Sequence, residues 1–199
     1  MATHQALPGR DAAENGFTLV ELLVYMVLAV VVLLIVGGVL INTLTTERTV
    51  RDATQASNTG QLVAKSVGHG VRNASDIWLS APGVVPELLM VRTVGSDATP
   101  NWFCQAWSYD SGEVRTSTST EAIMTGQTSS TVTSWTLLAD GVEPVVESAV
   151  AQPVFGVSGR QVTLNLDVST GDGQPVLIST VSTSRQPVSV TGVVPTCFP

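Results

Sequence analysis

The feature that most constrains this chain is an unbroken apolar segment near its amino terminus. Leu22–Ile41 contains 20 consecutive apolar residues, and no charged side chain occurs from Leu22 to Thr46. A helix of about 20 apolar residues crosses the roughly 30 Å hydrocarbon core of a bilayer. No second segment of this kind occurs in the 199 residues, so the sequence predicts a single-pass membrane protein with an extramembrane body. A purely soluble globule and a polytopic membrane protein are both excluded.

Residues 1–16, ahead of the apolar run, have the composition of a polar leader. An ordinary secretory signal has a basic start, a shorter apolar region and a small-residue cleavage site after that region. Here the small residue Gly16 precedes the apolar region, and Arg10 is offset by Asp11 and Glu14. The order is wrong for ordinary signal cleavage, so we expect this leader to be removed by another route.

Behind the apolar run, a helical pattern continues into a polar segment. Small and apolar residues recur at alternating steps of three and four from Val50 to Trp78, and no proline lies between Ala12 and Ala81. This predicts one helix, with residues 17–41 as its transmembrane part and 42–78 as its extramembrane amphipathic part. Because the stripe contains few Leu and Ile residues, we favour packing on the chain's own domain over a coiled coil.

Residues 79–199 have the composition of a β-rich globular head. Gln161–Val168 and Pro175–Val181 alternate apolar and polar residues around a turn-rich loop, which predicts an antiparallel hairpin. The predicted fold class is therefore α+β, with a long N-terminal helix packed on an antiparallel β-sheet. Further strand candidates are Glu87–Val94, Trp102–Tyr109, Val132–Leu138 and Val142–Val150.

The boundary between leader and apolar run carries the most specific motif, Gly16-Phe17-Thr18-Leu19-Val20-Glu21. It resembles the class III signal of the type IV pilin superfamily, which includes pilins, minor pilins and type II secretion pseudopilins. In that family, a membrane-embedded peptidase cuts after the glycine on the cytoplasmic side and methylates the new amino terminus. The resemblance implies cleavage between Gly16 and Phe17 and N-methylation of Phe17. A glycine suits such a site because its bare backbone enters a narrow cleft easily.

Glu21 is the last charge before 25 uncharged residues. A carboxylate at the border of a bilayer is costly unless it is paired. The resemblance supplies a partner, the methylated amine of Phe17 in a neighbouring subunit, and so implies a role for Glu21 in subunit assembly. Without the resemblance, Glu21 is simply a juxtamembrane acid.

A fainter likeness covers Gln61-Leu62-Val63 and Val71-Arg72-Asn73-Ala74, which precede an all-β region. These residues resemble W-type minor pilins and J-type minor pseudopilins. The resemblance implies a minor pilin-like subunit that joins or primes a type IV pilus or a related filament. The alternatives are a minor pseudopilin of a type II secretion or competence machine, and an adhesive binding module at a filament tip.

The same resemblance implies a set of partners and a location. The partners are the prepilin peptidase, the major pilin and other minor pilins, the membrane, and indirectly an assembly platform protein with its ATPase. The leader is expected in the cytoplasm and the head outside, later on a cell-surface filament. Counted charges favour the opposite orientation, because Arg48 and Arg51 follow the span. We follow the motif, since cleavage requires the leader inside.

The cysteines and the adjacent glycines each leave two interpretations open. Cys104 and Cys197 form one disulfide outside the cytoplasm, or they are two buried free thiols. Gly37 and Gly38 mark a helical segment that unwinds in a fibre, or a site of close helix packing in the membrane.

Enzymatic chemistry receives little support, and we expect no catalytic residue, no cofactor and no metal. His4 falls in the leader and His69 on the polar helix, so a Ser-His-Asp triad or a His/Cys metal cluster lacks its parts. The loop Asp167–Asp172 resembles a calcium loop but lacks a closing glutamate, and its residues are those of a hairpin turn. Residues 79–199 carry 4 arginines against 10 acids, which argues against direct nucleic-acid binding.

Overall fold

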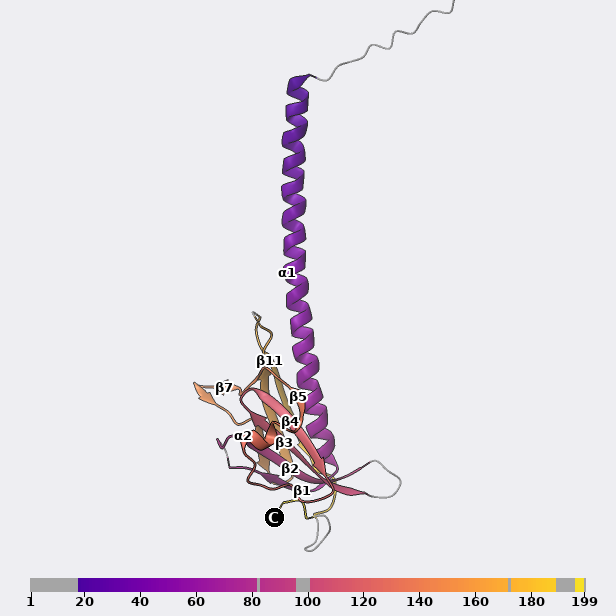
Figure 1. Cartoon of the computed structure of the whole chain (residues 1–199), viewed down its shortest axis with the longest axis vertical. Helices are drawn as coiled ribbons and strands as arrows, with labels where there is room; N and C mark the ends of the chain where they lie inside the picture. The colour runs from indigo at the N-terminus through magenta and orange to yellow at the C-terminus, as the bar shows by residue number, and fades with distance from the viewer. Residues whose placement is uncertain (1–17, 82, 96–100, 172, 189–195, 199) are drawn as a thin grey trace, which may run out of the picture. The chain divides into compact units, whose positions relative to one another are not determined.

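The computed structural model describes residues 18–198 apart from 82, 96–100, 172 and 189–195. The chain divides into two compact units, Met1–Glu47 and Arg48–Pro199. Helix α1 (Leu19–Arg72) begins in the first unit and continues as the long helix of the second unit (Figure 1). The architecture is α+β and pilin-like: a long apolar N-terminal helix followed by antiparallel sheet.

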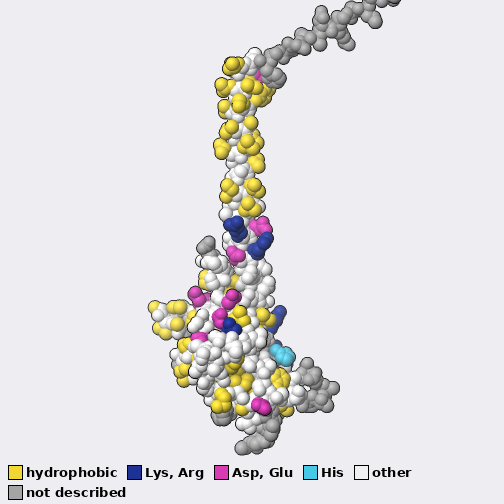
Figure 2. Space-filling model, in the orientation of Figure 1, with side chains coloured by type: hydrophobic (Ala, Val, Ile, Leu, Met, Phe, Trp, Pro, Cys, Tyr) yellow, Lys and Arg dark blue, Asp and Glu magenta, His cyan; other side chains and the backbone are white. Residues whose placement is uncertain are grey.

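From Leu19 onward, the first unit is helical, with apolar side chains on all faces of the helix. The large aliphatic side chains of this helix are exposed from Leu19 to Leu44. A stretch of 18 residues within it has a mean hydropathy of 3.1. Figure 2 shows apolar side chains around this part of α1. A helix that is apolar all round requires an apolar environment, and this one is long enough to cross a membrane.

The second unit, the head, contains two main antiparallel sheets. A five-stranded sheet has the order β1-β2-β3-β4-β5, and a second sheet has the order β11-β10-β6 with β9 also paired to β10. Strands β7 and β8 form a separate hairpin, and α2 (Ser129–Val132) is a single turn. The strands are β1 (Ala74–Leu79), β2 (Glu87–Val94), β3 (Trp102–Asp110), β4 (Glu113–Ser119), β5 (Thr136–Ala139), β6 (Val142–Glu143), β7 (Val146–Glu147), β8 (Val150–Ala151), β9 (Phe155–Ser158), β10 (Gln161–Val168) and β11 (Val176–Thr183).

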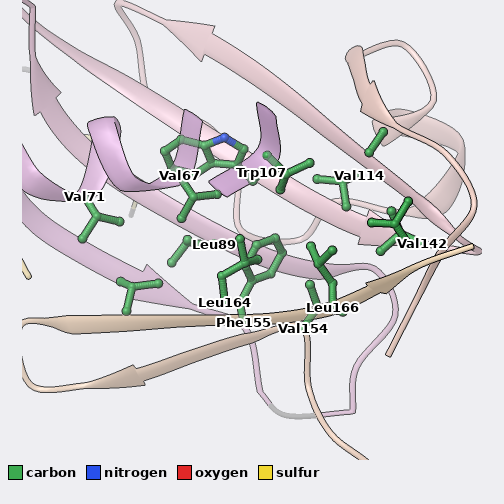
Figure 3. Packing of buried hydrophobic residues seen from close by; sticks show 14 of the residues in the cluster. Val67, Val71, Leu89, Trp107, Val114, Val142, Val154, Phe155, Leu164 and Leu166 are labelled. Carbon is green, nitrogen blue, oxygen red and sulfur yellow. The ribbon is translucent and has the colours of Figure 1, made fainter. Parts of the chain in front are cut away.

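The main core of the head lies where α1 meets both sheets. Val67 and Val71 of α1, Trp107 of β3 and Leu164 and Leu166 of β10 belong to one buried cluster. Figure 3 shows these side chains converging from the helix and from strands of both sheets. The preference for packing on the chain's own domain is confirmed, and the residues that α1 buries are Ala56, Gly60, Val63, Val67, Gly68, Gly70 and Val71.

Two glycines let α1 approach the sheets closely. A Cβ added at Gly60 would collide with the side chain of Ile178 on β11, and one added at Gly70 would collide with the indole of Trp107. Between them, Ser66 Oγ accepts a hydrogen bond of 2.9 Å from Trp107 Nε1. The helix is therefore fixed against β3 and β11 by backbone proximity as well as by side-chain burial.

The helix ends at Arg72, so the predicted boundary at residue 78 is wrong. Ala74–Leu79 form β1, which pairs antiparallel with β2. The Gly70 carbonyl accepts from Thr93 Oγ1 at 3.0 Å, and the Arg72 carbonyl accepts from the Arg185 N–H at 3.1 Å. Hydrogen bonds from Thr93 on β2 and from Arg185 after β11 satisfy carbonyls of the last helical turn, and Ile77 and Trp78 favour a strand. These contacts outweigh the helical spacing that the sequence continues beyond Arg72.

The predicted hairpin is confirmed by β10 and β11, and the prediction for β2 has the observed bounds. The segment 132–138 is only half strand, because the turn of α2 precedes β5. The segment 142–150 is broken into β6, β7 and β8, since Pro144 interrupts it and Ser148 and Ala149 adopt positive φ in the β7–β8 turn.

A second buried cluster covers the other face of the five-stranded sheet. It contains Met90 and Cys104, and Trp78 and Trp135 pack against it. Cys104 on β3 forms a disulfide with Cys197, with the two Cα atoms 5.2 Å apart. The Cys197 carbonyl accepts a hydrogen bond from the Ile123 N–H at 2.9 Å. The carboxyl-terminal residues are therefore tied to this face covalently and through the backbone.

Candidate functional site

The candidate site begins at the first turn of α1. Thr18 precedes the helix, and its Oγ1 accepts a hydrogen bond of 3.2 Å from the Glu21 N–H. The Thr18 carbonyl accepts the first helical bond, from the Leu22 N–H at 3.1 Å. A threonine that satisfies an otherwise unpaired N–H three residues on is an N-cap. Thr18 therefore fixes where the helix starts and places Glu21 in its first turn.

The Glu21 carboxylate has a partner on its own helix. Tyr25 lies one turn further on and donates a hydrogen bond of 3.4 Å from its Oη to Glu21 Oε1. An ionised carboxylate has about four acceptor positions, so this bond leaves room for further donors. The motif did not predict this contact, although the spacing of four residues from Glu21 to Tyr25 is the signal for it.

The surroundings of this pair are apolar. Leu22, Leu23 and Val24 flank it, and each is about half exposed on the isolated helix. A side chain with a free carboxylate oxygen on such a helix can recognise a cation that arrives through an apolar environment. Gly16 and Phe17, the predicted cleavage and methylation residues, lie outside the described residues.

In the head, Glu87 is a buried acid whose carboxylate accepts backbone hydrogen bonds from the start of β9. Its Oε2 accepts backbone hydrogen bonds from Val154 at 2.9 Å and from Phe155 at 3.3 Å. Burial raises the pKa of Glu87, and the two backbone N–H groups offset part of that rise. Tyr109, directly opposite Glu87 on β3, has its pKa raised by burial and by nearby carboxylates, Glu87 first among them. Glu87 joins β2 to the start of β9 and so connects the two sheets.

Arg92 is a buried, positively charged side chain of the head. Its Nη1 donates to Ser75 Oγ at 2.9 Å, and its guanidinium lies 4.1 Å from the centre of the Trp102 ring. Burial lowers the pKa of Arg92, and the charge of Asp76 acts in the opposite direction. Ser75 and Asp76 are on β1 and Arg92 on β2, so these contacts fasten the edge strand that follows α1.

The remaining candidates for chemistry are dispersed. His69 is exposed on α1, with its Nε2 3.4 Å from Asn73 Nδ2. In the part of the chain that the structure describes, no group of three or more His, Cys, Asp or Glu side chains is placed to hold a metal ion. Asp167 is on β10, whereas Asp172 of the calcium-like loop lies outside the described residues.

The comparisons with known proteins agree with the geometry of the helix start. Residues 11–37 match the family model of the prokaryotic N-terminal methylation motif. No curated protein and no solved structure matches the chain. The match spans the leader boundary, the Thr18 cap, the Glu21–Tyr25 pair and most of the apolar run.

Proposed function

We propose that this chain, which its methylation motif and α+β architecture identify as a precursor of the type IV pilin superfamily, is a minor pilin-like filament subunit. Prepilin peptidase cuts the precursor between Gly16 and Phe17 and methylates Phe17. The subunit then joins or primes a type IV pilus or a related filament. The observation that carries this proposal is the motif at residues 11–37, continued in the structure by a capped helix with Glu21 in its first turn.

The proposal assigns a role to each segment of the chain. Residues 1–16 are the cleaved leader, and residues 17–41 hold the subunit in the membrane. Residues 42–72 are the extramembrane part of the helix, and from Arg48 onward they form the head together with the strands that follow. The leader faces the cytoplasm and the head lies outside, where an oxidising environment maintains the Cys104–Cys197 disulfide.

Anchoring does not need Glu21. Removing a large aliphatic side chain from water contributes roughly 1.5–3 kcal/mol, and the apolar helix has many such side chains. Loss of one border carboxylate therefore leaves insertion intact and removes a polar group that lipid tolerates poorly.

Assembly does need Glu21. Lipid tails are as apolar as leucine, so the hydrophobic effect gives little reason to exchange lipid for another helix. A charge pair between Glu21 and the Phe17 amine of a neighbour supplies the specificity, because each charge left unpaired in an apolar interior is heavily penalised. Tyr25 occupies one carboxylate oxygen and leaves other acceptor positions for that amine.

The removal of an apolar helix from the bilayer requires external work. The proposal therefore includes an assembly platform protein and its ATPase as indirect partners. Within the filament, the direct partners are the major pilin and other minor pilins, whose amino-terminal helices surround α1.

The experiment replaces Glu21 in a strain that lacks the wild-type copy. Glu21→Val and Glu21→Gln are both expected to be cleaved and membrane-bound, yet absent from sheared filaments or unable to prime them. The glutamine variant separates charge from size, because it keeps the shape of the side chain and one acceptor oxygen but removes the charge. Tyr25→Phe is the matched control, since it removes a hydroxyl from the same turn and leaves the charge. Normal incorporation of Glu21→Val would show that Glu21 is only a border acid.

A further inference from the structure

One exposed face of α1 in the head is basic. Leu62, Lys65, His69 and Arg72 follow one another at steps of three and four and are all exposed, whereas the opposite face is buried in the core. We call these four residues the basic stripe. No acid occurs from residue 53 to residue 75, and neither Lys65 nor Arg72 forms an ion pair with any described residue.

The outer face of the second sheet carries an acidic counterpart. Glu143 on β6, Asp167 on β10 and Leu177 on β11 are direct neighbours across the strands. We call these three residues the acidic row. Asp167 points away from the core because its neighbours Leu166 and Val168 are buried, and Leu177 is 58% exposed.

The acidic row is electrostatically unfavourable within a single head. Like charges directly opposite each other on paired strands are destabilising. Two arginines of the head are engaged elsewhere: Arg115 pairs with Glu113 at 2.8 Å, and Arg160 donates to Ser184 and to the Gln186 carbonyl. Asp52 and Asp140 add to the negative potential, because both line an open pocket of about 270 Å³ beside Val168. An incoming cation therefore relieves a repulsion that the isolated head retains.

The two surfaces lie at different levels of the same head. A Cβ on Gly60 would be 3.2 Å from Val168 Cγ2, which places the end of β10 beside Gly60 of α1. The middle of the basic stripe is about seven residues further along α1, or ~10 Å at 1.5 Å per residue. Figure 2 shows most of the visible Asp and Glu side chains of the head on its face, with one Lys or Arg among them, while another Lys or Arg and a His lie at its edge.

We propose that the basic stripe of one copy docks on the acidic row of a second copy of this chain. The inference rests on the proposed function and adds which surfaces of adjacent heads meet. The precursor carries a net charge of −7, so its copies repel one another unless a basic surface meets an acidic one. Leu62 and Leu177, both at least half exposed, supply an apolar contact beside the charges.

The arrangement favours an open array over a closed dimer. The two surfaces differ, so the contact between copies is heterologous, and in a pair one copy keeps its acidic row unused while the other keeps its basic stripe unused. Repetition of such a contact with an axial offset generates a filament rather than a pair. The subunit is therefore expected to occur in runs of at least two copies.

The sequence provides a sharp test, because Lys65 is the only lysine in the chain. A carbodiimide joins a lysine amine to a carboxylate that already contacts it, without a spacer. Treatment of sheared filaments that contain the full-length subunit should give a covalent dimer. Its cross-linked peptide should join Lys65 to Glu143 or Asp167. Lys65→Arg is the matched control: it keeps the charge and should incorporate normally, but it should give no cross-linked peptide between residue 65 and the acidic row.

Exchanging the charges of the two surfaces by mutation tests the same contact without a cross-linking reagent. An exposed ion pair changes an association constant by about 1.4- to 5-fold, so reversing two pairs should lower incorporation on the order of tenfold. Lys65→Glu with Arg72→Glu should show this loss. Adding Glu143→Lys with Asp167→Lys to the same chain should restore incorporation, because the two surfaces are again complementary.

Three outcomes would overturn the docking. They are the absence of a cross-link in filaments that contain the subunit, a link from Lys65 to another protein, and a link to a carboxylate outside the acidic row. None of these affects the proposed function. That function fails separately, if wild-type protein is missing from sheared filaments and is not needed to prime them, or if Glu21→Gln incorporates normally.

Discussion

Gly70 of α1 offers the most direct test of how the helix sits on the sheet. In Gly70→Ala, the new methyl group would overlap the indole of Trp107 and lie 2.9 Å from Gln105 Oε1. Trp107 is fully buried, so the rigid ring has no free space into which to move. Overpacking of this kind costs typically ~1–3 kcal/mol, while alanine in a helix recovers up to ~1 kcal/mol. We expect a net loss of about 1–2 kcal/mol.

Gly68→Ala is the matched control on the same helix. Its methyl group would lie 3.1 Å from Arg72 Nη1 and from Ser182 Oγ, which are ends of side chains that can turn away. The same gain in helix propensity then applies without a rigid obstacle, so this variant should be neutral or more stable than wild type.

The assay is urea unfolding of the head fragment that starts at Arg48, the start of the second compact unit, followed by tryptophan fluorescence. The free energies of unfolding should rank Gly68→Ala at or above wild type and Gly70→Ala below both. Equal stabilities for the two alanine variants would refute the close approach of α1 to Trp107.

Two further predictions concern the head. Because burial raises the pKa of Glu87 above its unfolded value, its contribution to stability is fully present below the ordinary glutamate pKa and is lost as pH rises through the raised pKa. The pH dependence of unfolding measured for wild type minus Glu87→Gln should show that decline, and a flat difference would contradict it. The Cys104–Cys197 disulfide closes a loop with a sequence separation of 93, for which loop entropy sets an upper value of about 4–5 kcal/mol. Cys104→Ala with Cys197→Ala should therefore lower the urea midpoint clearly, and an unchanged midpoint, or two titratable thiols in wild-type protein from oxidising expression, would argue against the bridge.

The sequence predicted the structure best in segments where a single hydrophobic pattern was present. The apolar run is helical and apolar on all faces, and the alternation of Gln161–Val168 predicted β10 with its observed bounds. These segments were predictable because burial dictates a single period along each of them. The motif at Gly16–Glu21 could also be recognised from the sequence, because its residues directly precede an uncharged run.

The errors arose where tertiary contacts outweigh local pattern. Ala74 and Trp78 continued the spacing of the helical stripe, but pairing with β2 converts that segment into β1. The contacts of Glu21 with Tyr25 and of Glu87 with the start of β9 were also missed. The Glu87 contact joins residues 67 positions apart, and no local pattern reports such a pairing.

The measurement that tests the central claim most directly is the mass of the protein extracted from membranes of cells with an active prepilin peptidase. Our account predicts a chain that begins at Phe17 and carries one methyl group on its amino terminus. The cleavage removes Arg10, Asp11 and Glu14, so the net charge changes from −7 to −6. A protein that retains residues 1–16 in such cells would contradict its assignment as a pilin-like precursor.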